Sequence, residues 1–140
     1  MTALPTRAAV DTGALLALAS SRDQYHARAV RTAERFRERG GRWVGSLFVI
    51  AELHGHLLKR LGPTPARRVV DAVLGDPIFD WRDAGAELVR EATARWIDRF
   101  ADQPFSMTDA VTFELMRRER INHAFAYDRH FTVAGYQLLA

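Results

Sequence analysis

Residues 7–20, RAAVDTGALLALAS, predict a strand, a turn and a helix in direct succession. The run from Arg7 to Val10 is apolar after its first residue and has no helical period, whereas residues 12–20 have the composition of a buried helix. Asp11 stands at the junction between the two. Because open α/β sheets bind ligands beyond the carboxyl ends of their strands, this aspartate is the first candidate for a functional role.

The remainder of the chain repeats this alternation of strands and helices. Apolar periodicity and Gly or Pro boundaries predict helices at residues 24–39, 46–61, 64–74, 84–101 and 108–120, and strands at residues 42–45, 78–81, 122–127 and 136–139. Parallel strands need crossover connections, and helices are the usual crossovers. We therefore expect a three-layer α/β/α fold with a central, mainly parallel sheet of about five strands.

Length and composition indicate one globular domain. The 140 residues correspond to a single compact core, so residues 1–140 are expected to form one domain. Apolar residues make up 48% and charged residues 26%, which is typical of folded soluble domains. The chain contains no cysteine, and this excludes disulfides, thiolate zinc sites and a cysteine nucleophile.

Charge and hydropathy exclude further classes of protein. Lys59 is the only lysine, and the P-loop pattern GxxxxGK[ST] is absent, so lysine-based and P-loop mechanisms are disfavoured. The apolar runs are far shorter than the roughly 18 residues of a membrane span. The apolar patches in residues 1–9 are also too short for an export signal, and we expect a cytoplasmic protein without membrane contact.

Four carboxylates are candidates for a site: Asp11, Glu52, Asp109 and Asp128. Three of them have a plain structural alternative. Asp11 can act as a helix cap, Asp109 fits a capping box that begins at Ser106, and Asp128 can be a turn residue.

Glu52 is harder to explain structurally, because it lies within the apolar run Leu47 to Leu53. Burial of an unpaired carboxylate costs several kcal/mol, so Glu52 must reach a cation, a metal or solvent. The structural alternative is a partly exposed glutamate paired with one of the arginines. Together, the four acids would gather at one edge of the sheet, which is the donor set of a hard cation such as Mg²⁺ or Mn²⁺.

Four motifs, in order along the chain, resemble those of PIN-domain ribonucleases, and in particular the VapC-type toxins of bacterial toxin–antitoxin pairs. They are VDTGALLAL at residues 10–18, IAEL at residues 50–53, SMTDA at residues 106–110 and AYDRHF at residues 126–131. Tyr127 departs from the pattern, since a small residue is frequent at its position. The resemblance covers nearly the whole chain.

The resemblance implies a metal-dependent endoribonuclease. It implies Asp11, Glu52, Asp109 and Asp128 as catalytic, Mg²⁺- or Mn²⁺-binding residues, with Thr12, Ser106 and Thr108 as supporting hydroxyls. It also implies an RNA substrate, a cognate antitoxin of the VapB type and a homodimer. From the residues themselves, apolar and arginine-rich helices at 24–39 and 46–61 are expected to frame a groove for the partner.

Two other functions stay open at this point. A haloacid-dehalogenase-like phosphatase also begins with an aspartate after the first strand, but it needs a second aspartate where Gly13 stands. A non-catalytic PIN-like module that binds RNA or protein would keep the fold without the metal-dependent reaction.

The histidines and arginines give weaker indications. His56 shares a helical face with Glu52 and is either a neighbour of the acidic site or an ordinary amphipathic histidine. His130 is expected to lack a partner. The arginine-rich stretches at residues 28–42 and 117–120 are either RNA contacts or solvated faces, which the nearby acids Glu34, Glu38, Glu114 and Glu119 would balance.

Overall fold

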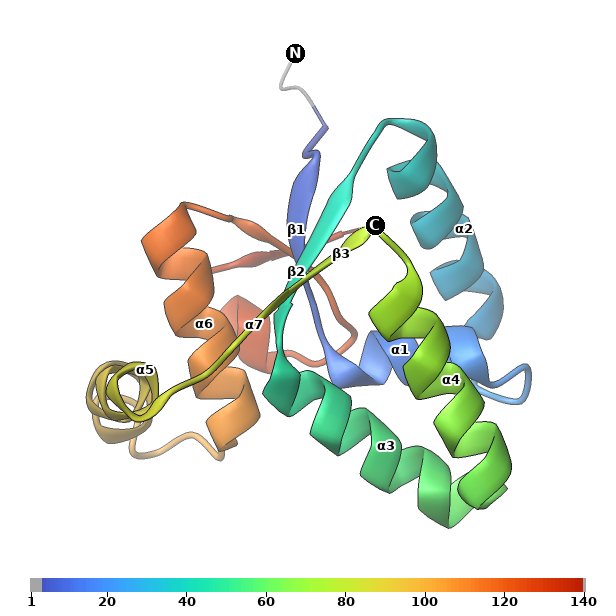
Figure 1. The fold of residues 1–140 in the computed structure, drawn as a ribbon. Helices are drawn as coiled ribbons and strands as arrows, with labels where there is room; N and C mark the ends of the chain where they lie inside the picture. Colours follow the sequence, from blue (N-terminus) through green and yellow to red (C-terminus); the bar gives the residue numbers. More distant parts are fainter. Residues whose placement is uncertain (1–3, 140) are drawn as a thin grey trace.

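The computed structural model describes residues 4–139, in which five strands form one central sheet (Figure 1). The strands are β1 (Arg7–Val10), β2 (Arg42–Ser46), β3 (Phe79–Arg82), β4 (His123–Phe125) and β5 (Gln137–Leu138). Their order is β3-β2-β1-β4-β5, and every neighbouring pair is parallel. The predicted α/β class and the sheet of about five parallel strands are therefore confirmed.

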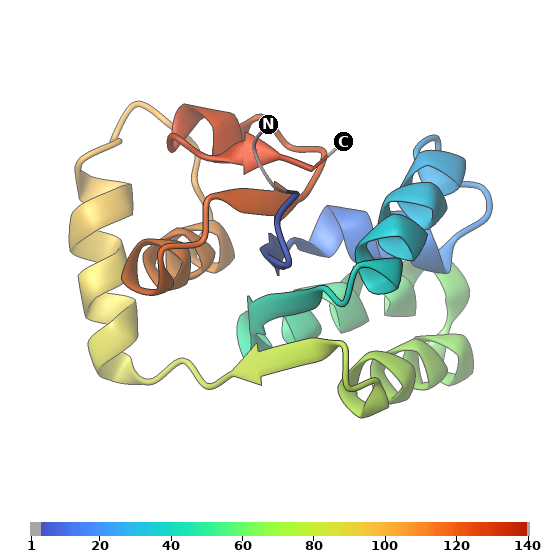
Figure 2. The same cartoon turned by 90° about the horizontal axis from the view of Figure 1, so that it is seen from above.

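Helices cover both faces of the sheet, as Figure 2 shows from above. The helices are α1 (Thr12–Ala19), α2 (His26–Glu38), α3 (Leu47–Leu61), α4 (Pro63–Gly75), α5 (Ala86–Ala92), α6 (Met107–Glu119) and α7 (His130–Val133), with a π-helical turn η1 (Thr93–Asp98) after α5. Helices α1 to α4 lie on one side, and α5, η1 and α6 lie on the other (Figures 1 and 2).

Strand β1 lies in the middle of the sheet and contributes to both cores, because successive side chains of a strand point to opposite faces. Ala8 and Val10 belong to the core beneath α1 to α4, and Ala9 belongs to the core beneath α5 and α6. All three are buried completely or almost completely. A short run of small and β-branched residues therefore lets β1 pack under helices on both sides and places Asp11 at the centre of one sheet edge.

The helical hairpin of α3 and α4 depends on Gly62 between them. Its φ of 89° lies in the left-handed region, which a glycine adopts without steric cost. Pro63 then occupies the first position of α4, where a missing backbone N–H costs nothing. This sharp turn joins α4 to α3, the helix that carries Glu52.

One local prediction is wrong, and one helix was not predicted. Residues 84–101 do not form one α-helix, because α5 passes into the wider π turn η1, which carries the buried Trp96. Helix α7 was not predicted, since its four residues are too few for a periodic pattern. It begins where the Asp128 side chain accepts the backbone N–H of His130.

None of the helices within residues 4–139 is both long enough and apolar enough to cross a bilayer. The expectation that residues 1–9 form no export signal includes residues 1–3, which lie outside the described range.

Candidate active site

An acid-lined hollow of about 340 Å³ lies at the carboxyl end of β1 and β4. The parallel pairing of these two strands brings Asp11 and Asp128 to the same edge, as the sequence predicts. The hollow is lined by Asp11, Thr12, Gly13, Leu16, Glu52, His56, Pro104, Ser106, Asp109, Tyr127, Asp128 and His130. All four candidate carboxylates therefore border one space, although they come from four separate parts of the chain.

Asp11 follows β1 and is 8% exposed. It stands at the N-cap position of α1, but among residues 4–139 its side chain makes no capping hydrogen bond, so capping does not account for it. Burial, followed by the negative charge of Asp109, raises the pKa of Asp11 to about 7, and the charges of Glu52 and Asp128 add to this. The carboxylate is thus held in a place where its own charge is costly without a cation.

Asp109 is held by the capping box that the sequence predicts at the start of α6. Its Oδ2 accepts the backbone N–H of Ser106 at 3.1 Å, and the Ser106 hydroxyl accepts the backbone N–H of Asp109 at 3.0 Å. Burial raises the pKa of Asp109, against the opposing effect of hydrogen bonds from Ser106 and His130. Asp109 therefore caps its helix and also faces the hollow.

His130 joins two of the acids, so the expectation that it lacks a partner is wrong. Its Nδ1 lies 3.1 Å from Asp109 Oδ2 and 3.3 Å from Asp128 Oδ2. Since both neighbours are hydrogen-bond acceptors, we assign the ring proton to Nδ1. The sequence could not indicate this contact, because it joins α7 to the start of α6 across 21 positions of the chain.

Asp128 is more open than Asp109, with a side chain that is 41% exposed against 11%. Its Oδ1 accepts the backbone N–H of His130 at 2.8 Å, so the turn role considered from the sequence is present. Its Oδ2 lies beside the His130 ring, and both residues line the hollow. The two carboxylate oxygens thus have separate environments.

Glu52 and His56 lie on the face of α3 that borders the hollow. Glu52 is partly exposed, and none of the arginines in residues 4–139 forms an ion pair with it. The alternative of an arginine-paired glutamate therefore finds no support. His56 also lines the hollow, so of its two interpretations the structure supports the one that makes it a neighbour of the acidic site.

The three candidate hydroxyls differ in position. Thr12 Oγ1 is buried and has no hydrogen-bond partner among the described residues, and Thr12 lines the hollow. Ser106 also lines the hollow and takes part in the capping box. Thr108 is buried and is not among the lining residues of the described part of the chain; its backbone carbonyl accepts the hydroxyl of Thr112.

The donor set of the hollow fits a hard divalent cation, because carboxylate and hydroxyl oxygens are the preferred ligands of Mg²⁺ and Mn²⁺. The buried Thr12 hydroxyl without a partner and the raised pKa of Asp11 both indicate groups that a cation would satisfy. Within residues 4–139, no three Asp, Glu or His side chains are already drawn together closely enough to enclose an ion.

Helix α6 also carries a second buried acid, Glu114, which is fully enclosed. Its carboxylate accepts hydrogen bonds from Arg117 Nη2 at 2.7 Å, Arg118 Nε at 3.1 Å and Trp96 Nε1 at 3.1 Å, and Arg95 lies 3.3 Å away. The sequence interpretation of Glu114 as part of a solvated, charge-balanced face is therefore wrong. The arginines are balanced by it, but the carboxylate itself is inside.

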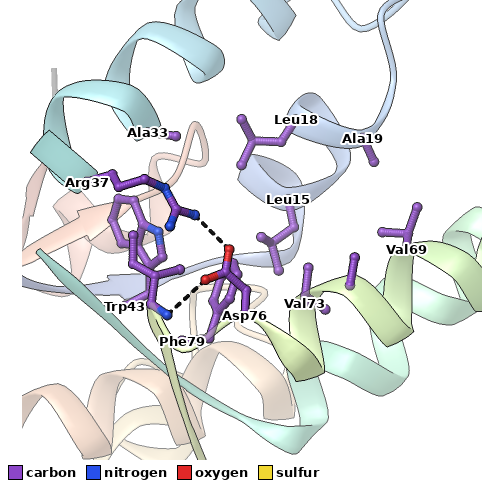
Figure 3. A pocket seen from close by; sticks show the side chains of 12 residues that line it. Leu15, Leu18, Ala19, Ala33, Arg37, Trp43, Val69, Val73, Asp76 and Phe79 are labelled. Carbon is purple, nitrogen blue, oxygen red and sulfur yellow. Dashed lines mark hydrogen bonds and ion pairs between the residues drawn. The ribbon is translucent and has the colours of Figure 1, made fainter.

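An apolar hollow of about 260 Å³ lies on the opposite side of α1, between α1, α2 and α4 (Figure 3). Leu15, Leu18 and Val73 project into it, and the ion pair of Arg37 with Asp76 spans its edge at 2.6 Å. The sequence predicted a groove framed by residues 24–39 and 46–61. The second of these helices, α3, contributes no lining residue within the described range, because α1 packs against both α2 and α3.

Comparison with known proteins identifies the family. The PIN domain family model matches residues 8–135. A stretch of 48 residues is 33% identical to the 23S rRNA-specific endonuclease VapC20 of two Mycobacterium tuberculosis strains, CDC 1551 / Oshkosh and ATCC 25618 / H37Rv. This stretch is 34% of the chain and only 37% of the length of the relative.

The fold comparison extends over almost the whole chain. The crystal structure of M. tuberculosis VapC20, described as a sarcin-ricin loop cleaving toxin, is similar with a TM-score of 0.81 and 26% sequence identity. The similarity covers 91% of this chain and 95% of that one. The chain therefore belongs to the PIN-domain family, and its resemblance to the VapC-type members is confirmed.

Proposed function

We propose that this protein is a metal-dependent endoribonuclease and the toxin of a toxin–antitoxin pair. The observation that carries the proposal is the convergence of Asp11, Asp109, Asp128 and Glu52 on one hollow, where none of the four forms an ion pair with an arginine within the described residues. The relatives named as VapC-type endonucleases support the reaction class.

The cofactor in this proposal is Mg²⁺ or Mn²⁺, held by Asp11 and Asp109 with Glu52 and Asp128 contributing. When bound, such an ion lowers the pKa of a coordinated water and offsets the charge that develops on the phosphate. Burial and, after it, repulsion from the neighbouring carboxylates raise the pKa of Asp11, and both favour uptake of a cation.

The chain's own residues hold these acids in place. The Ser106 N–H fixes one oxygen of Asp109, and His130 bridges Asp109 and Asp128. The Thr12 hydroxyl lies beside the acids without a hydrogen-bond partner among the described residues. Asp109 and Asp128 are therefore oriented before substrate arrives, which lowers the cost of assembling the reacting groups.

The substrate in this proposal is structured ribosomal RNA, because the relatives are named for 23S rRNA and the sarcin-ricin loop. The protein is expected to act in the cytoplasm, where ribosomes lie. The direct test is incubation of purified protein with ribosomes and Mg²⁺ or Mn²⁺, followed by sequencing of the new RNA ends. Asp11→Asn should abolish the cut.

Asp98→Asn is the matched control, since Asp98 is an exposed carboxylate on η1, on the other side of the sheet. It should cut like the wild type. If neither wild type nor control cleaves RNA with either metal, the nuclease assignment fails and the non-catalytic binding module becomes the better account.

The partner in this proposal is a small antitoxin protein that places an apolar segment in the hollow between α1, α2 and α4 (Figure 3). An amphipathic helix or extended segment is the usual occupant of such a groove. We also propose a homodimer, on family resemblance. Expression of the protein alone should arrest cell growth, and the antitoxin should relieve the arrest; harmless expression of a folded, active protein would contradict the toxin role.

A further inference from the structure

Tyr127 forms the wall of the acidic hollow between β4 and Asp128. Tyr25, which precedes α2, stacks on its ring with centroids 4.4 Å apart and planes inclined by 12°. Stacking of this kind adds roughly 0.5–1.5 kcal/mol to the packing of an aromatic pair. The first turn of α2 is therefore attached to the rim of the candidate active site.

Arg28 lies in that first turn of α2 and is placed over the same ring. Its guanidinium carbon is 5.4 Å from the Tyr127 centroid, which is within cation–π distance. Arg28 is exposed, and its guanidinium forms no ion pair or hydrogen bond with any residue in the described range. Its N–H donors therefore stay open to an anion while the aromatic ring restrains the guanidinium.

Other arginines of the same basic stretch are engaged elsewhere. Arg37 pairs with Asp76, and Arg39 donates to the backbone carbonyl of Pro5. Arg31, one turn after Arg28, is exposed and forms no ion pair within residues 4–139. The start of α2 therefore carries two exposed arginines that no described acid neutralises.

We propose that Arg28, held over Tyr127 at the rim of the acidic hollow, binds a backbone phosphate of the RNA next to the bond that is cut. This inference rests on the proposed function. An acidic centre repels a polyanion, so binding requires fixed positive charge close to the centre, and a guanidinium matches a phosphate well. A phosphate is favoured over a base because Tyr25 and Arg28 already cover the Tyr127 ring.

The experiment measures binding of a fluorescein-labelled RNA oligonucleotide in EDTA, by anisotropy between 50 and 200 mM NaCl. EDTA removes the metal, so cleavage does not interfere. Arg28→Gln should weaken binding about 3- to 10-fold and reduce the slope of log K against log[salt] by about 0.7, the value for one single-strand phosphate contact. Arg28→Lys should keep the slope, because it keeps the charge, but bind less tightly than the wild type.

Arg90→Gln is the matched control. Arg90 is also exposed and free of ion pairs within residues 4–139, but it lies on α5, across the sheet from α2 (Figure 1). Its loss should leave both affinity and slope unchanged. Tyr127→Leu removes the ring under the guanidinium but keeps the Arg28 charge, so it should weaken binding less than Arg28→Gln and leave the slope unchanged.

Three results would overturn the inference: no measurable RNA binding by the wild type, equal losses in Arg28→Gln and Arg90→Gln, or an Arg28→Gln protein that binds RNA normally. Normal RNA binding with weakened antitoxin binding would assign Arg28 to the protein partner. A wild type that binds RNA through Arg28 but never cuts it with metal would contradict the proposed function and leave the phosphate contact intact.

Discussion

Helix α6 carries two buried acids that the protein treats in opposite ways. Burial tends to raise the pKa of Glu114, but hydrogen bonds from Arg117, Arg118 and Trp96 outweigh it and lower the pKa to about 2. At the start of the same helix, Asp109 faces Asp11 across the acidic hollow, and the pKa values of both acids are raised. One end of α6 is neutralised by the protein itself, and the other end is left negative.

This difference separates a structural acid from a functional one. A buried carboxylate that protein cations surround stabilises the fold and has no charge left for a ligand. A buried carboxylate beside other carboxylates destabilises the empty protein, and the binding of a cation relieves that cost. The two ends of α6 should therefore respond in opposite ways when their acids are replaced.

The largest effect is expected from Asp11→Asn in the acidic hollow. Metal-dependent RNA cleavage should fall by more than the roughly 100-fold that loss of an outer-shell partner costs. The amide keeps the shape and loses the charge. Single-turnover cleavage of a susceptible RNA measures the loss, with circular dichroism to show an intact fold, and full activity of the folded variant would remove Asp11 from the site.

At the other end of α6, Glu114→Gln should cost about 2–3 kcal/mol of stability, because it leaves Arg95, Arg117 and Arg118 close together without the acid that offsets them. Urea unfolding gives the value, with the slope of the transition checked for constancy. Glu91→Gln, an exposed acid on α5, is the control and should change stability by less than about 0.5 kcal/mol. Equal stability of Glu114→Gln and wild type would mean that the arginines do not depend on this acid.

A smaller loss is expected from Asp128→Asn. Of the two acids that contact His130, Asp128 has the more exposed side chain. Cleavage and metal affinity should fall about 10- to 100-fold. The amide oxygen can still accept the His130 backbone N–H, so the melting temperature should change little. An unaltered metal affinity in the folded variant would exclude Asp128 from the site.

The smallest effect concerns stability and pH in the metal-free protein. The pKa of Asp11 is about 7 in the fold against an ordinary 3.8, so its contribution favours the fold below about pH 4 and is lost as the pH rises to about 7. Glu114 behaves oppositely: its contribution is complete above 4.5 and is lost as the pH falls towards 2.

Asp11→Asn should therefore be more stable than the wild type at pH 7.5, by on the order of 2 kcal/mol, and the difference should shrink towards pH 4. Thermal unfolding in EDTA at several pH values measures it. A difference that stays constant with pH would show that Asp11 titrates in the fold as it does in the unfolded chain.

The sequence indicates those parts of the molecule whose signals are local. An apolar strand followed by Asp11 and a helix predicts the position of that acid, and the Ser106 to Asp109 spacing predicts the capping box that the structure contains. The parallel pairing of β1 with β4 then follows from the α/β pattern and places Asp128 near Asp11.

The features that could not be predicted depend on contacts between distant segments. His130 meets Asp109 only because the short helix α7 folds back onto α6, and four residues carry no periodic signal. Glu114 looks like a surface acid among arginines in the sequence, and its burial arises from the π turn that brings Trp96 against α6. Neither contact leaves a trace in local composition.

We infer that the acidic hollow holds a divalent cation through its carboxylates. The most direct measurement is a titration of purified, EDTA-treated protein with Mn²⁺, in which electron paramagnetic resonance reports the free ion. Saturable binding is expected for the wild type and for Glu114→Gln, with binding at least about 10-fold weaker in Asp11→Asn. Equal Mn²⁺ affinity in the wild type and Asp11→Asn, or no binding by either, would contradict it.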